Sequence, residues 1–238
     1  MSRISYFVLL TLILILNCNS NKRDQLDNSN VISVGAMRDV MWKGELDGKI
    51  KLDTIKNKSG LYGLGPEIYL SGEILINNGK IFVSRVVTDS AMIVEEKENI
   101  EAPFFVYGNV NNWTEMQLPK TITSIKSLEE FINDKTKTQK RPFAFKLRGT
   151  ISSGVIHVQN LPKGTKVSSP KEAHQGQVNY KLASEHVEII GFFSTEHQGI
   201  FTHHDSYLHM HLITKDLKKM GHLDEVIFDN MTLFLPKS

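Results

Sequence analysis

Three histidines near the C-terminal end of the chain are spaced as ligands of one metal ion. His209 and His211 alternate with apolar residues, and on an extended strand two such side chains project to the same side. A polar turn follows, and a hairpin would return His222 beside them. Three imidazoles leave a fourth coordination position open to water or substrate, which is the arrangement of a catalytic zinc site. The alternative is a solvated strand face with an unrelated histidine beyond the turn.

One carboxylate, Glu73, lies on an otherwise apolar strand after a glycine-rich segment, residues 59–67. Strand parity places Glu73 on a face with Ser71 and Leu75, so parity alone does not bury it. We predict a loop for the glycine-rich segment. It lacks the Lys-Ser/Thr pair of a phosphate-binding loop, and it precedes a hairpin rather than a helix, so no nucleotide site is expected.

Residues 1–30 have the pattern of an export signal followed by a polar tether. Residues 6–16 form an apolar run of the length of a secretory signal core, too short to span a bilayer. Cys18, the one cysteine of the chain, follows directly, as in a bacterial lipoprotein signal in which the cysteine is acylated. We therefore expect a protein of the bacterial cell envelope, either lipid-anchored to a membrane at Cys18 or secreted.

Size and charge narrow the function classes. The 238 residues are enough to bury a full core and to form one large or two small domains. The 28 basic and 26 acidic residues leave a formal charge of +2, and the basic residues are scattered. A nucleic-acid partner is not expected, because it would need a basic face with interleaved aromatic residues. We expect a small-molecule substrate instead.

Past residue 30 the pattern predicts an α+β fold of mixed or antiparallel sheets with few short helices. The dipeptide Asn78-Gly79 between two β-rich runs is typical of a hairpin turn. The other expected elements are a helix in residues 31–42, a strand at 104–110, a helix at 127–135 begun by Ser127, strands at 143–151, 155–158 and 187–194, and a mobile loop at 162–176. We predict two lobes, an N-terminal sheet lobe of residues 31–140 and a metal-bearing sheet lobe of residues 141–238.

Three separated motifs together resemble the α-acetolactate decarboxylase family. His209-Met210-His211, followed after a turn by Gly221-His222, is similar to the metal signature of that family. The glycine-rich segment and the strand that carries Glu73 resemble a second family motif, and residues 37–48 resemble a third. The resemblance runs from about residue 31 to 234, with the motifs in the family's order.

The resemblance implies a lyase that converts 2-acetolactate to acetoin. The family's zinc ligands correspond to His209, His211 and His222, and its acid/base glutamate corresponds to Glu73. Zinc would act as a Lewis acid toward the hydroxyl and keto oxygens of the substrate, and Glu73 would supply a proton. The resemblance also implies a homodimer, although no interface is visible in the sequence.

The chain departs from the family at several positions. An arginine of the family corresponds to His157, a second to Leu217, and a loop threonine to Pro66. The family's C-terminal tail, whose glutamate reaches the site, has no counterpart before the printed sequence ends at Ser238. Arginine presents paired N–H donors and a permanent positive charge to a carboxylate, whereas histidine is positively charged only when it is protonated. We predict that His157 takes the role of the substrate-orienting arginine.

Two other function classes remain open at this point. One is a zinc-dependent hydrolase or lyase that acts on another small hydroxy or keto acid, and the other is a non-catalytic envelope lipoprotein of the same fold. A polar cluster just before the metal strand fits either class, as groups beside the metal ligands or as a metal-scavenging surface loop. It consists of His197, His203, His204 and Asp205.

Overall fold

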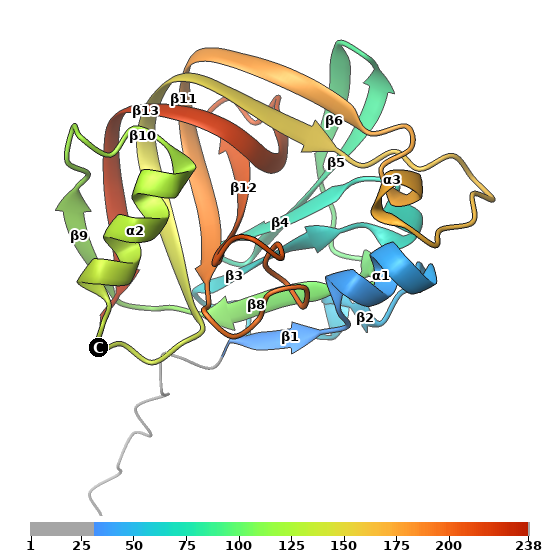
Figure 1. Cartoon of the computed structure of the whole chain (residues 1–238), viewed down its shortest axis with the longest axis horizontal. Coiled ribbons are helices and arrows are strands. Elements are labelled where there is room, and N and C mark those ends of the chain that lie inside the picture. The colour runs from blue at the N-terminus through green and yellow to red at the C-terminus, as the bar shows by residue number, and fades with distance from the viewer. Residues whose placement is uncertain (1–30, 238) are drawn as a thin grey trace, which may run out of the picture.

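The computed structural model describes residues 31–237 (Figure 1). A first sheet has six strands, and every neighbouring pair in it is antiparallel. Their order across the sheet is β1 (Ile32–Val34), β8 (Phe105–Asn109), β3 (Leu61–Pro66), β4 (Glu73–Asn77), β5 (Lys80–Thr88) and β6 (Ala91–Glu96). The first sheet thus comes from the N-terminal half of the chain.

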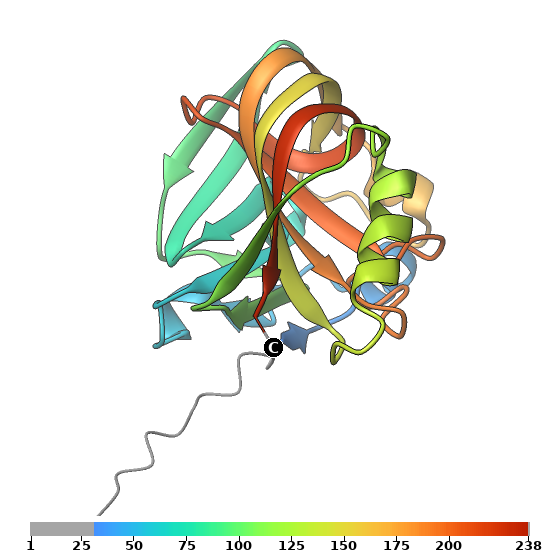
Figure 2. The ribbon, with the colours of Figure 1, turned by 90° about the vertical axis from the view of Figure 1, so that its left-hand side faces the viewer.

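The second sheet is built from long, curved strands. Its order is β10 (Phe143–Val158), β11 (Val178–Phe193), β12 (Leu208–Thr214), β13 (Met220–Pro236) and β9 (Trp113–Gln117), with all pairs antiparallel. Strand β10 also pairs with β13, so β10 to β13 close into a ring. Figure 2 shows this curvature from the side. The two sheets confirm the predicted fold class.

Short elements complete the fold. Strands β2 (Ile50–Lys51) and β7 (Glu101–Ala102) form a two-stranded sheet. The α-helices are α1 (Met37–Lys43), α2 (Ile125–Lys135) and α3 (Pro170–Ala173), and the 3₁₀ turns are η1 (Leu52–Thr54) and η2 (Ile68–Leu70). Within residues 31–237, none of these helices has the length and apolar character needed to span a membrane.

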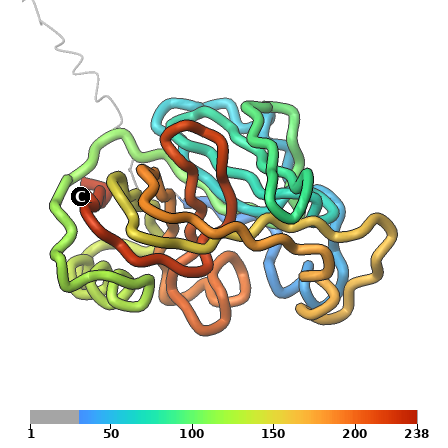
Figure 3. Tube along the Cα trace, turned by 90° about the horizontal axis from the view of Figure 1, so that it is seen from above, coloured from blue at the N-terminus to red at the C-terminus, as the bar shows by residue number. Residues whose placement is uncertain are grey.

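The two sheets share one apolar core. Leu64, Leu75 and Val106 of the first sheet pack with Ile190 and Ile213 of the second, and all five are buried. Each such side chain contributes about 1.5–3 kcal/mol by its removal from water. The view from above shows the first sheet lying against the curved second sheet (Figure 3). This packing brings β4 toward the β12–β13 hairpin.

The change between the sheets falls earlier in the chain than the predicted lobe boundary near residue 140. Strand β9 belongs to the second sheet. Leu128 and Ile132 of α2 pack in the core of that sheet, together with Leu118. Both elements lie before residue 140, so the sheets divide the chain between β8 and β9. The sequence did not indicate this because β9 pairs with β13, which lies far along the chain.

Two helices begin elsewhere than predicted. Residues 31–42 were expected to be helical, but Ile32–Val34 is strand β1, and α1 begins at Met37. The second helix begins at Ile125, because Ser124 is its N-cap and Ser127 closes a capping box with it. Ser127 is therefore the third residue of α2 rather than the residue before it.

The prediction of a loop for the glycine-rich segment is wrong. Leu61–Pro66 is strand β3, and all its residues are buried. A Cβ on Gly63 would lie 2.7 Å from the Phe105 ring, and a Cβ on Gly65 would lie 2.6 Å from the Phe104 carbonyl oxygen. The glycines therefore allow β3 and β8 to lie close together with the Phe105 ring against them. The glycine content of this segment suggested a loop. The glycines are instead needed because the packing of β3 against β8 leaves no room for side chains at these positions.

The predicted hairpin and the predicted mobile loop have different outcomes. The β4–β5 hairpin is confirmed, and its turn residues Asn78 and Gly79 have φ of 51° and 87°, the left-handed values of a type I′ turn. The segment 162–176 is more ordered than expected, since it contains α3. Val167 and Ala173 of this segment are buried against Val40 of α1.

Candidate metal centre

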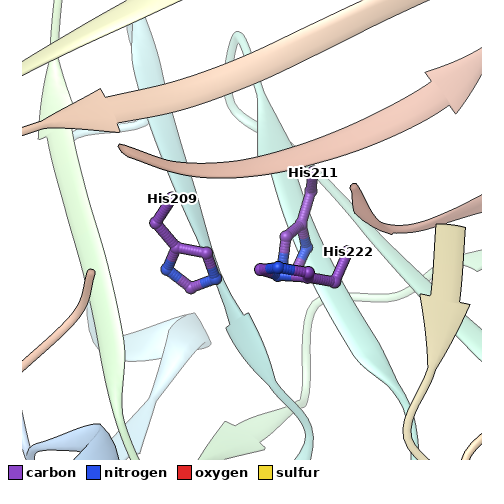
Figure 4. A group of neighbouring side chains, drawn as sticks. All are labelled: His209, His211 and His222. Atoms are coloured by element: carbon purple, nitrogen blue, oxygen red, sulfur yellow. The ribbon is translucent and has the colours of Figure 1, made fainter. Parts of the chain in front are cut away.

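The β12–β13 hairpin brings three imidazoles together (Figure 4). His209 and His211 project from the same face of β12, as the period of a strand requires. His211 lies directly opposite His222 of β13 in the strand register. One nitrogen from each ring can be chosen so that all three lie within 4.8 Å of one another, and all three side chains are buried. The structure thus brings together the three histidines predicted as metal ligands.

Electrostatics favour the neutral form of these rings. Burial lowers the pKa of His211 to about 3, and the neighbouring His157 adds to the effect. Burial also holds the pKa of His209 and His222 well below the usual range, with further lowering by the adjacent imidazoles. Neutral imidazole is the form that binds a metal ion. Among the described residues, neither ring nitrogen of His211 has a hydrogen-bond partner, so a metal ion bound there would satisfy a buried polar atom. The cluster therefore fits a divalent cation with nitrogen ligands.

His157 continues the row of histidines onto a third strand. It lies on β10 opposite His222, and the two rings stack with their centroids 4.6 Å apart. The Nδ1 atom of His157 is 2.8 and 2.9 Å from the two carboxylate oxygens of Asp224. This leaves Nε2 facing Glu73, with 3.9 Å between Nε2 and Glu73 Oε1.

Glu73 comes to the site from the first sheet. It is the first residue of β4 and only 3 % exposed, because the docking of the two sheets covers it. Its Oε2 lies 3.6 Å from His211 Nε2, and its Oε1 accepts a hydrogen bond of 3.4 Å from the backbone N–H of Gln159. Burial raises the pKa of Glu73 well above its usual value, so the protonated acid is favoured. The usual solvent-facing position of a lone strand glutamate does not apply here.

Two neighbours of these residues escaped the sequence analysis. Asp224 is the extra residue of a β-bulge, because Leu223 and Glu225 pair with consecutive residues of β10. Gln159 is buried and lies just past the end of β10. Asp224 shares strand parity with His222, which is the signal that could have pointed to it. No pattern in the sequence marks Gln159.

The four residues of the polar cluster before β12 lie in different surroundings in the structure. His203 Nε2 lies 3.2 Å from His222 Nε2. Burial, with His157 nearby, lowers the pKa of His203. His197 instead makes a hydrogen bond of 2.7 Å between its Nδ1 and Ser194 Oγ, and the side chains of His204 and Asp205 are exposed. One residue of the predicted cluster thus lies beside the metal ligands.

A small cavity adjoins the imidazoles. Its polar lining includes Glu73, His157 and Gln159, and its apolar side is formed by residues of α1 and of the first sheet and its connections, namely Met37, Met41, Pro66, Leu70 and Phe104. Leu217 does not line this cavity. It lies in the turn between β12 and β13 and is 48 % exposed.

Almost all of the described region matches a protein-family model. Residues 34–237 match the family model of alpha-acetolactate decarboxylase. This chain belongs to the alpha-acetolactate decarboxylase family. The resemblance inferred from three motifs is therefore confirmed, and with it the expectation of a lyase family whose members act on a small molecule.

Individual members of the alpha-acetolactate decarboxylase family are distant in sequence. The chain is 23 % identical to alpha-acetolactate decarboxylase of Brevibacillus brevis over 86 % of its length and 69 % of that protein. It is 25 % identical to the Lactococcus lactis subsp. cremoris decarboxylase over 74 % of its length and 71 % of that protein. The crystal structure of the Bacillus subtilis decarboxylase superposes with a TM-score of 0.73 at 20 % identity, covering 87 % of this chain and 86 % of that one. That likeness confirms the fold.

Proposed function

We propose that this protein decarboxylates 2-acetolactate to acetoin, with a zinc ion held by His209, His211 and His222. The observation that carries the proposal is the cluster of three buried imidazoles next to the buried carboxyl group of Glu73, in a chain of the decarboxylase family. A bound zinc ion would act as a Lewis acid toward the hydroxyl and keto oxygens of the substrate as carbon dioxide leaves. The protein's own side chains then have to orient the substrate and supply a proton.

Glu73 is the proton donor in this proposal. The loss of carbon dioxide breaks one carbon–carbon bond of the substrate. The electron pair of that bond stays on the substrate, so one carbon of the product must receive a proton. Glu73 lines the cavity, and burial raises its pKa well above the usual value, which favours the protonated form that an acid catalyst needs. A carboxylic acid in this position can give that proton and recover one from water when the product departs.

His157 orients the substrate carboxylate in place of the family's arginine. Asp224 holds Nδ1 of His157, which fixes the plane of the ring and leaves Nε2 on the side of Glu73 and the cavity. In the doubly protonated form Nε2–H would donate to the carboxylate of the substrate, and the Asp224 carboxylate would stabilise the imidazolium. The orientation therefore depends on a pair of residues, whereas an arginine would act alone.

The direct test is acetoin formation from racemic 2-acetolactate by the zinc-loaded protein. We expect acetoin with loaded protein and only the spontaneous rate after removal of the metal with a chelator. Zinc binding without acetoin would instead favour the two other classes, an enzyme for another small hydroxy or keto acid or a non-catalytic lipoprotein. A panel of small 2-hydroxy and 2-keto acids would then separate those two.

Attachment to the cell envelope is a separate proposal, and it rests on the sequence alone. The signal and Cys18 lie outside the described residues. A Cys18→Ala variant expressed in a bacterial host should lose incorporation of labelled fatty acid, whereas the intact chain should incorporate it. Unlabelled intact chain would favour secretion.

The homodimer remains a prediction that sedimentation can test.

A further inference from the structure

His203 lies at the open side of the histidine cluster, on the connection between β11 and β12. Its Nε2 is 3.2 Å from His222 Nε2, and its ring centroid is 5.0 Å from that of His222 and 6.3 Å from that of His209. It also lines the cavity next to the metal centre. A fourth imidazole therefore lies beside His222, outside the group of three whose nitrogens lie within 4.8 Å of one another, so it would reach a shared ion by rotation of its side chain.

The distance between His203 and His222 matches that of two ligands of one ion. Zinc–nitrogen bonds of 2.0–2.1 Å in a tetrahedron place two ligand nitrogens about 3.3 Å apart. Without a metal, the two nitrogens can share one N–H. When His222 Nε2 binds a cation, its lone pair can no longer accept that hydrogen bond. His203 can then bind the same ion through Nε2 as the tautomer that carries its proton on Nδ1.

The chain around His203 is anchored close to the site. Phe201 and Thr202, directly before it, are fully buried. The first amides of α1 hold the same connection, since Met37 N donates to the Ile200 carbonyl at 2.7 Å and Arg38 N donates to the Gly199 carbonyl at 2.9 Å. His204, directly after it, is exposed. The anchor therefore holds the backbone of His203 beside the cluster.

We propose that His203 is a fourth ligand of the metal ion in the substrate-free protein and that a chelating substrate displaces it. This inference rests on the proposed metal site. The resting centre is then a closed set of four imidazoles, in contrast to the open position inferred from the spacing of three. The cavity that His203 lines is small, with a volume of about 30 Å³. Displacement of His203 provides both the space and the coordination position.

Cobalt-substituted protein gives a direct count of the histidine ligands. Each imidazole bound to Co²⁺ through Nε2 has a strongly shifted proton NMR signal from its Nδ1–H. We expect four such exchangeable signals in the wild-type protein, three in His203→Ala, and four in the matched control His204→Ala. Zinc affinity, measured by competition with a chromophoric chelator, should weaken by a factor of about 10 or more in His203→Ala and stay unchanged in the control.

A bidentate hydroxamate then tests the displacement. It should reduce the wild-type count from four signals to three, because it takes the place of His203. Three signals in the resting wild-type protein would overturn the inference and leave the proposed three-histidine site intact. A wild-type protein that binds no Co²⁺ or Zn²⁺ would overturn the metal site and this inference together. His203→Gln serves as a second variant if the alanine variant does not fold.

Discussion

Two hairpins supply the site, and they do so in different ways. The β12–β13 hairpin brings His211 and His222 into direct register, so its own pairing forms most of the metal cluster. The β4–β5 hairpin contributes Glu73, whose register partners are Pro66 and Ser84 and which meets the histidines only because the two sheets pack together. The difference indicates that the cluster of three histidines is a local property of one hairpin, whereas its contact with Glu73 depends on packing between the sheets.

The largest effect is expected from breaking the histidine hairpin. His211→Ala should lose stoichiometric zinc and all acetoin formation, because two hairpin imidazoles and the displaceable His203 do not hold zinc tightly. Metal content of the purified, zinc-loaded variant measures this. His186→Ala is the matched control, since His186 is an exposed histidine of β11 away from the cluster. One zinc per chain in His211→Ala would show that the ligands lie elsewhere.

The second variant separates the two hairpins. Glu73→Gln keeps the shape of the side chain and removes its titratable proton, so zinc should stay bound. Turnover should fall by a factor on the order of 10² to 10⁴, the usual contribution of general acid–base catalysis. Initial rates of acetoin formation at matched zinc occupancy are the measurement. Full activity would remove Glu73 from the reaction and leave the β4–β5 hairpin without a chemical role.

A smaller effect is expected at the residue that orients His157. Asp224→Asn retains the shape of the side chain but loses the charge that supports an imidazolium, so kcat/KM should fall about 10-fold. Zinc content should not change. Glu225→Gln changes the same charge at the next residue, which faces away in the bulge, and it should be neutral. Equal losses in both variants would point to general surface charge instead of a His157–Asp224 pair.

The smallest effect tests how far the position of Glu73 depends on the packing of β3 against β8 in the first sheet. Gly65→Ala places a methyl group 2.6 Å from the Phe104 carbonyl oxygen, and the overpacking should lower the free energy of unfolding by about 1–3 kcal/mol. Because Gly65 precedes Pro66, the partner of Glu73, turnover should fall while zinc binding is retained. Urea unfolding and zinc titration of the same sample measure both. A loss of zinc together with turnover would argue against independent hairpins.

The same difference explains what the sequence could predict. The clustering of the three histidines and the Asn-Gly hairpin depend on local pairing, and the structure has both as expected. The strand at 104–110 is also present, although its partners β1 and β3 lie far from it in the chain. Burial of Glu73 depends on packing between distant segments, which strand parity does not describe. The glycine-rich strand was taken for a loop because its need for close approach to Phe105 is a tertiary property.

Two residues at the site depend on irregular backbone. Asp224 approaches His157 through a β-bulge, and bulges shift the register on which parity arguments rest. His203 approaches His222 through a loop that α1 anchors from a distant part of the chain. The sequence shows an aspartate and a histidine at these positions, but it does not show in which direction their side chains point. The family resemblance indicated the region of the site and could not supply these two contacts.

The central claim is that one metal ion, held by the histidine hairpin, supports decarboxylation with an acid from the other sheet. The most direct measurement is a titration of metal-free protein with zinc, following the rate of acetoin formation from 2-acetolactate. We predict that the rate rises linearly and reaches its plateau at one zinc per chain. A protein that binds one zinc per chain but forms acetoin no faster than buffer at any ratio would contradict the account.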